Sequence, residues 1–259
     1  MRLIDRHAHG DFSWIELGTT DPNAAKHFYT SLFGWDFVDS PMGPNDFYTM
    51  FTLDGRNAAA AYTLRPEQTL GGVPAHWNLY IDVASADDTS TRATELGASI
   101  KAGPFDVFTF GRMAVLADPT GAVFSVWEAR SHPGIGIADK HGSLCWADLS
   151  TSDPATGARF YAELFGYELE PGDGGYLHIK NRHQYIGGVQ PAERRDPNSP
   201  PHWLIYLQVD DCAGSTEQAK TLGASIYMGP MDIPKVGIMT VLADPQGATF
   251  ALFQPAPRG

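Results

Sequence analysis

The segment Phe12–Phe37, FSWIELGTTDPNAAKHFYTSLFGWDF, decides the fold, because the chain contains it twice. The second copy is Leu144–Leu169, LCWADLSTSDPATGARFYAELFGYEL, and equivalent residues of the copies lie 146 − 14 = 132 positions apart. A tryptophan, an Asp-Pro pair, a Phe-Tyr pair and a glycine all recur at this spacing. An internal repeat is the first feature to establish, since it determines how the rest of the chain is interpreted.

Each copy predicts a strand followed by a capped helix. The run Trp14-Ile15-Glu16-Leu17 alternates with the period of two that a half-buried strand requires. Asp21 can then cap a helix whose first position is Pro22, and Gly34 can end that helix in the left-handed conformation. The apolar residues between these limits fall on one helical stripe: Ala24, Ala25, Phe28, Leu32 and Phe33.

A second block also repeats, at a spacing of 202 − 76 = 126 residues. It contains the His-Trp pairs at 76–77 and 202–203, the two LGASI segments, and the Asp-Pro turns at 118–119 and 244–245. The first half is itself two passes of strand, helix and three strands, because Gly34 and Gly97 mark the same helix end in each pass. The chain is therefore a gene duplication with four βαβββ modules.

A length of 259 residues allows two domains of ordinary size, and the repeat favours this division. We expect a first domain over residues 1–132 and a second over residues 142–259. Residues 133–141 have the glycine and proline content of a linker.

Composition excludes several classes of partner. The net charge of −12 and the pI near 5.0 argue against nucleic acid and anionic membranes, which both select basic surfaces. No apolar run is long enough to span a bilayer, and the N-terminal residues lack the apolar core of a signal peptide. Cys145 and Cys212 occupy non-equivalent places in the repeat, so we expect reduced thiols and a cytoplasmic protein.

The chain resembles the vicinal oxygen chelate superfamily of glyoxalase I, bleomycin-resistance proteins and extradiol dioxygenases. The DPxxAxxFYxxLFGW run, the LGA segments and the hairpins ADPTGAVFSVWE and ADPQGATFALFQ carry this resemblance. It is especially close to a duplicated, two-domain subgroup that includes a mycobacterial culture-filtrate antigen. The resemblance implies an α+β fold in which paired modules form a cup-shaped, eight-stranded mixed sheet per domain, with helices outside. Because the modules pair within one chain, a monomer or a homodimer is expected.

Strand alternation identifies the side chains that should line the cups. In each strand the apolar phase should pack on the helices and the other phase should face the cup. We expect two sets of ligand-binding residues, which are mainly aromatic with a few polar groups. The first set is Trp14, Glu16, His76, Asn78, Tyr80, Ser125 and Trp127; the second is Trp146, Asp148, His202, Tyr206 and Phe253.

The resemblance also implies where metal ligands would lie. In metal-using members these positions correspond to Trp14, Asn78 and Ser125 in the first half and to Trp146, Leu204 and Ala251 in the second. Trp, Leu, Ser and Ala do not supply the donors of a catalytic divalent metal, so no metal or cofactor is expected. His76 and His202 could contribute to a metal site only if the register were shifted.

We therefore expect a metal-independent protein that binds a small aromatic or amphipathic molecule in one or both cups. An enzyme of the same superfamily is the alternative, either a metal-dependent lyase or dioxygenase or a cofactor-free enzyme. In the cofactor-free case Glu16 or Asp148 would be the general base, with a pKa raised by desolvation. A third possibility is an interaction module whose cups are filled by their own aromatic side chains.

Overall fold

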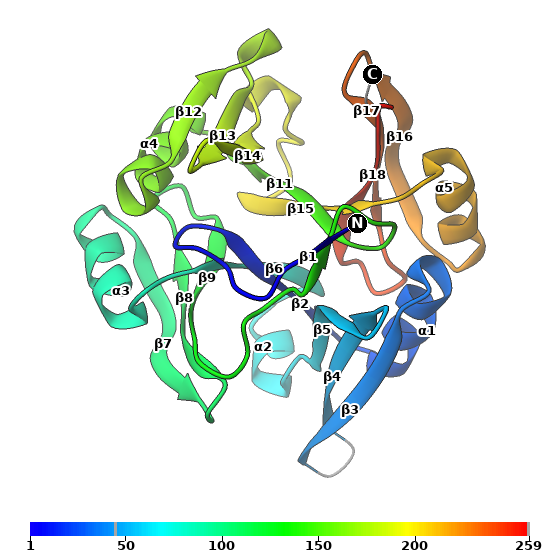
Figure 1. The fold of residues 1–259 in the computed structure, drawn as a ribbon, viewed down its shortest axis with the longest axis horizontal. Coiled ribbons are helices and arrows are strands. Elements are labelled where there is room, and N and C mark those ends of the chain that lie inside the picture. The colour runs from blue at the N-terminus through cyan, green and yellow to red at the C-terminus, as the bar shows by residue number, and fades with distance from the viewer. Residues whose placement is uncertain (44–45, 258–259) are drawn as a thin grey trace.

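The computed structural model describes residues 1–43 and 46–257, and it contains two eight-stranded mixed sheets with helices packed on them (Figure 1). The first sheet comes from two modules, β2 (Phe12–Thr19), α1 (Pro22–Phe33), β3 (Asp36–Gly43), β4 (Asp46–Leu53), β5 (Arg56–Thr63) and β6 (His76–Asp82), α3 (Ala86–Glu95), β7 (Ser99–Val107), β8 (Gly111–Ala117), β9 (Val123–Ala129). The second comes from β11 (Leu144–Ser150), α4 (Pro154–Phe165), β12 (Glu168–Pro171), β13 (Leu177–Asn181), β14 (Gln184–Val189) and β15 (His202–Gln208), α5 (Cys212–Thr221), β16 (Ser225–Ile233), β17 (Gly237–Ala243), β18 (Thr249–Pro255). The predicted α+β class is confirmed.

The two sheets have the same topology. Their strand orders are β3-β4-β5-β2-β6-β9-β8-β7 and β12-β13-β14-β11-β15-β18-β17-β16, and the first strands of the paired modules meet antiparallel at the centre. Glu16 lies opposite Asn78 in the first sheet, and Asp148 lies opposite Leu204 in the second. Equivalent residues of the repeat therefore occupy equivalent places in space.

The helix limits follow the predicted capping chemistry. The Asp21 side chain accepts hydrogen bonds from the backbone N–H groups of Asn23 and Ala24, and Gly34 ends α1 with a φ of 67°. In α4, Asp153 caps the backbone N–H of Thr156 in the same way. Both helices have 12 residues, and no helix in the described ranges is long and apolar enough to cross a bilayer.

The first helix of each half packs against the other half. The Tyr29 hydroxyl of α1 accepts a hydrogen bond from Trp77 Nε1 at 3.0 Å and donates one to Asp244 Oδ2 at 2.9 Å. In the second half, Trp203 Nε1 donates to the Tyr161 hydroxyl at 2.8 Å. Figure 1 shows the result, with α1 beside α5 and α3 beside α4. One continuous hydrophobic core therefore serves both sheets.

Several short elements lie outside the four modules. Strand β1 (Arg2–Leu3) pairs with β10 (Ile137–Ala138), and the Ile135 N–H donates to the Ser13 carbonyl at 2.8 Å. The expected linker, residues 133–141, is therefore packed on the start of β2, and the domain limits stay a prediction. The structure also adds three short helices that the sequence analysis did not predict: α2 (Pro66–Leu70), η1 (Asp173–Gly175) and η2 (Ala192–Arg194).

The end of β6 makes the stability of the fold depend on pH. Asp82 lies beside Asp11, whose carbonyl accepts its backbone N–H. Burial, with the charge of Asp11, raises the pKa of Asp82 to about 7. An aspartate in the unfolded chain titrates near pH ~3.9, so the folded chain binds an extra proton between these values. The free energy of unfolding should therefore fall as the pH rises through this window.

We expect Asp82→Gln, which introduces the residue found at the equivalent position 208, to remove this dependence. Urea denaturation should show that the variant is more stable than the wild type at pH 8 by about 1 kcal/mol, a value reduced because Asp82 is partly exposed. At pH 4 the two proteins should be equally stable. Asp232→Asn, an exposed change on β16, is the control. An equal effect of Asp82→Gln at both pH values would contradict the assignment.

Candidate functional site

Each sheet has an inner face, which is the face opposite to its helices. Alternate residues of β6 separate the two environments: Trp77 contacts Tyr29 of α1, whereas Tyr80 donates a hydrogen bond to Glu16. In β15, Trp203 contacts Tyr161 of α4, whereas Tyr206 bonds to Asp148. These contacts place the two acidic residues on the inner faces.

The first inner face holds a carboxylate among phenols. The Tyr80 hydroxyl lies 2.7 Å from Glu16 Oε2, and Glu16 itself is partly exposed. Burial raises the pKa of Glu16, and hydrogen bonds from Tyr80 and Tyr48 oppose that rise. Burial and the charge of Glu16 also raise the pKa of Tyr62 to about 12. Tyr80 and Tyr48 therefore stay protonated near neutral pH and donate to the Glu16 carboxylate, and the Tyr62 phenol beside this cluster also stays protonated.

The second inner face holds the corresponding carboxylate, Asp148, which accepts more hydrogen bonds than Glu16 does. Asp148 Oδ1 accepts hydrogen bonds from Tyr176 at 2.5 Å and from Trp146 Nε1 at 2.9 Å. Its Oδ2 accepts from Tyr206 at 2.7 Å and from Gln190 Nε2 at 3.2 Å. Asp148 is only 4% exposed, so these four donors replace water around the buried carboxylate.

The partners of the two carboxylates are equivalent in the repeat. Tyr80 corresponds to Tyr206, and the strand registers make Tyr48 equivalent to Tyr176 and Tyr62 equivalent to Gln190. The sequence analysis missed these residues of the β4–β5 hairpin and of its copy around β13 and β14. Their spacing is 176 − 48 = 128 residues, which differs from both spacings found in the sequence. Aligning the hairpin strands separately would have revealed the tyrosine pair.

The two inner faces differ in the polar groups that they leave unpaired. Asn78 Nδ2 donates to Ser125 Oγ at 2.7 Å, but Asn78 Oδ1 is buried without a partner among the described residues. At the position of Asn78 the second sheet has Leu204. The first inner face thus offers two hydrogen-bond acceptors, Asn78 Oδ1 and the partly exposed Glu16, whereas Asp148 is fully occupied.

The predicted tryptophans of the first sheet enclose a residue that the sequence analysis did not select. The ring of His132 lies 4.6 Å from that of Trp14 and 6.0 Å from that of Trp127, nearly perpendicular to both. Trp127 Nε1 also donates to the His132 carbonyl at 3.0 Å. His132 belongs to the segment after β9, which was expected to lie at the edge of a linker and so gave no signal of a packed ring.

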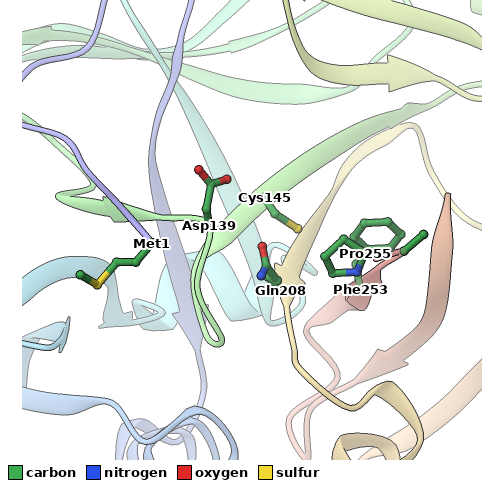
Figure 2. A pocket seen from close by; sticks show the side chains of 7 residues that line it. Met1, Asp139, Cys145, Gln208, Phe253 and Pro255 are labelled. Carbon is green, nitrogen blue, oxygen red and sulfur yellow. The ribbon is translucent and has the colours of Figure 1, made fainter. Parts of the chain in front are cut away.

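A hollow of about 490 Å³ opens on the second half (Figure 2). Phe253, which was predicted to bind ligand, lies on its wall, and its ring is 6.4 Å from that of Tyr206. Burial raises the pKa of the Cys145 thiol well above its usual range, so this group is neutral near pH 7. The residues around the hollow are Met1, Asp139, Cys145, Gln208, Phe253, Pro255 and Ala256.

The ring of each predicted histidine lies within hydrogen-bond distance of a backbone carbonyl just before its strand. His76 Nδ1 is 2.8 Å from the Pro74 carbonyl, and His202 Nδ1 is 2.9 Å from the Pro200 carbonyl. Across residues 1–43 and 46–257, no three His, Cys, Asp or Glu side chains are grouped as a metal site would require. The positions where metal-using relatives would place ligands hold Trp14, Asn78 and Ser125, and these residues do not fit a catalytic divalent metal.

The saturation of Asp148 predicts a large cost for its neutralisation. Asp148→Asn replaces a carboxylate oxygen by an NH₂ group that faces donors, and we expect it to lower the free energy of unfolding by about 3 kcal/mol. Glu16→Gln is the matched variant, and its cost should be below about 1 kcal/mol because Glu16 has fewer donors and is partly exposed. Urea denaturation of both variants measures the difference. Equal costs would contradict the asymmetry of the two clusters.

Comparison with known proteins agrees with this architecture. Residues 11–126 match the family described as the Glyoxalase/Bleomycin resistance protein/Dioxygenase superfamily, and residues 146–253 match a glyoxalase-like domain. CFP32, a candidate glyoxylase of Mycobacterium tuberculosis (strain CDC 1551 / Oshkosh), is 37% identical over an alignment of 255 positions that covers 96% of each chain. The anthracycline biosynthesis protein DauV of Streptomyces sp. (strain C5) is 34% identical over an alignment of 266 positions that covers 97% of this chain and 95% of DauV.

Two solved structures share the fold at low sequence identity. The 2,3-dioxygenase LapB from Pseudomonas sp. KL28 has a TM-score of 0.67 and 13% identity, and the match covers 98% of this chain and 95% of LapB. The Mn(II)-bound glyoxalase from Novosphingobium aromaticivorans has a TM-score of 0.65 and 16% identity, with coverage of 95% and 83%. On its topology and its sequence matches, the chain belongs to the glyoxalase/bleomycin resistance protein/dioxygenase superfamily.

Proposed function

We propose that the protein binds a small aromatic or amphipathic molecule, without a metal ion, on the inner face of one or both halves. The observation that carries this proposal is the recurrence of a carboxylate, Glu16 or Asp148, among phenol and indole groups at the same place in both sheets. Aromatic walls with a few polar groups are typical of small-molecule sites. We place this function in a cytoplasmic monomer or homodimer.

The polar groups indicate what the ligand should carry. Glu16 and Asn78 Oδ1 both accept hydrogen bonds, so a phenol, hydroxyl or amine on the ligand would satisfy them. DauV, at 34% identity, and DnrV of Streptomyces peucetius, at 33%, are named as anthracycline biosynthesis proteins. Anthracyclines are polycyclic aromatic compounds with phenolic hydroxyls, so these relatives support the same class of ligand.

The donor set supports binding without a metal. Trp14, Asn78 and Ser125 stand where metal ligands would be expected, and an indole is not a ligand for a divalent ion. The dioxygenase and glyoxalase structures share only the fold with this chain, so they do not transfer their metal chemistry.

One observation favours a cofactor-free enzyme as a second candidate. Glu16 is partly exposed and burial raises its pKa, which makes its carboxylate a stronger general base than an exposed glutamate. Asp148 is a weaker candidate because four donors already hold its carboxylate. A filled interior is the third candidate, since Trp14 and Tyr80 are only 5% and 4% exposed.

Titration with 1-naphthol, a planar phenol, tests the proposal. We expect quenching of tryptophan fluorescence that is saturable and is unchanged by EDTA. Asn78→Leu, which introduces the residue at the equivalent position 204, and Glu16→Gln should each weaken binding by about fivefold, because each removes one hydrogen-bond acceptor.

The matched control is Thr109→Ala, a change at the exposed β7–β8 turn that should leave the affinity unchanged. Absence of saturable quenching across a panel of bicyclic and tricyclic phenols would favour the filled interior. Loss of binding in EDTA that is restored by a divalent metal would overturn the metal-independent mechanism.

A further inference from the structure

We propose that one of the two joints between the halves is a pH-sensitive contact, in which residues 8–11 release the second half as the pH rises. Residues 8–11 are called the first strap, and their copies in the repeat, residues 140–143, are called the second strap. Each strap lies at the start of its own half and is also held by the other half. The two straps share their backbone contacts, and only the first has a pair of carboxylates at its contact with the sheet.

Each strap attaches to its own sheet by the same backbone hydrogen bonds. The Gly10 N–H donates to the Asp82 carbonyl at 2.8 Å. In the copy, the Gly142 N–H donates to the Gln208 carbonyl, also at 2.8 Å. The Asp82 N–H donates back to the Asp11 carbonyl at 2.9 Å, and the second strap repeats this bond. The repeat therefore supplies an internal reference for every change in the first strap.

The other half holds each strap by the carbonyl group of its glycine. The Tyr167 hydroxyl donates to the Gly10 carbonyl at 2.5 Å, and Trp35 Nε1 donates to the Gly142 carbonyl at 3.0 Å. The ring of the exposed His9 also packs against α4 of the second half. Both glycines are left-handed, with φ values of 83° and 80°, and a Cβ at either one would lie within 3.1 Å of the ring that holds it. Each strap is thus a close joint between the halves.

The two joints differ in charge. Asp11 and Asp82 of the first joint correspond to the neutral residues Ser143 and Gln208 of the second. The Asp11 carboxylate also accepts a hydrogen bond from Asn181 Nδ2 of the second half at 2.7 Å. Asp11 therefore attaches the first strap to the second half and is at the same time the charged neighbour of Asp82.

Asp11 is the one charge that acts on Asp82 among the residues that the structure describes. The β9 residue opposite Asp82 is Trp127, and the carboxylate of Glu128 beside it accepts a hydrogen bond from the Ala86 N–H at 3.0 Å. Burial shifts the pKa values of the other titratable groups around the joint toward their neutral forms: His7, His132 and Tyr167. Two carboxylates thus share this joint without a balancing cation among the described residues.

Ionisation of Asp82 opposes the attachment of the first strap, because it puts a second negative charge beside Asp11. Burial, with the charge of Asp11, raises the pKa of Asp82 to about 7 in the closed joint. When the strap is released, Asp82 regains the pKa of ~3.9 that an exposed aspartate has. The closed joint holds one more proton than the open joint between these two values. Release therefore becomes easier as the pH rises from 4 to 7.

Amide hydrogen exchange of the full chain, measured by NMR at pH 5 and pH 7, tests the proposal. After correction for intrinsic exchange rates, the protection of the Gly10 N–H should fall by about tenfold relative to that of the Gly142 N–H, a fall that one-proton linkage allows over this range. Gly142 makes the same bond to a neutral residue, so it reports any loosening of the whole chain. A relative fall of less than about threefold would overturn the proposal.

Asp82→Gln, which introduces the residue found at position 208, identifies the titrating group. Gly10 should then be equally protected at both pH values, because no proton is released when the strap opens. Asp232→Asn, an exposed change on β16, is the control and should keep the wild-type dependence. Near-UV circular dichroism establishes that both variants retain the fold. A pH dependence of Gly10 that persists in Asp82→Gln would assign the effect to another group and contradict the proposal.

Discussion

The hydrogen bond from Trp77 to Tyr29 and its copy from Trp203 to Tyr161 connect the sheets to the helices between them. Each tyrosine is fully buried and belongs to a helix that packs across the boundary between halves. Tyr29 also reaches Asp244, in the last hairpin turn of the other half. A phenol in this position must keep its proton, since burial and the charge of Asp244 raise its pKa well above the usual range. The shared core is thus fixed by directional bonds as well as by apolar contact.

The packing of each sheet against its helices determines which side chains lie on its inner face. Trp77 and Trp203 are directed to the helices. Strand alternation therefore places Glu16 and Asp148 on the inner faces among aromatic residues. A carboxylate in such surroundings needs donors, and both halves supply tyrosine hydroxyls from equivalent positions of the repeat. The halves differ in how many donors surround the carboxylate. Asp148 accepts four hydrogen bonds, whereas the first half has fewer donors at Glu16 and leaves Asn78 Oδ1 without a partner among the described residues.

Much of the fold could be predicted from the sequence, because it depends on local rules that the repeat displays twice. The caps at Asp21 and Gly34, the period of two in β2 and the turn at Asp118 all act within a few residues. The phase of the strands also placed Trp14, Glu16 and Tyr80 together. Tyr48 and His132 could not be found in this way, because their positions depend on hairpin register and on a backbone segment packed across β2.

The alternation of side chains along β6 and β15 has a consequence for how such a protein can diversify. Residues that hold the halves together and residues that face the interior sit on opposite sides of the same strands, so exchanging Asn78 or Leu204 leaves the tryptophan–tyrosine contacts untouched. Substitutions on the inner face can change the ligand preference of one half while the other half keeps its own. A duplicated chain of this construction can therefore acquire a new chemical preference without first weakening the scaffold that supports it.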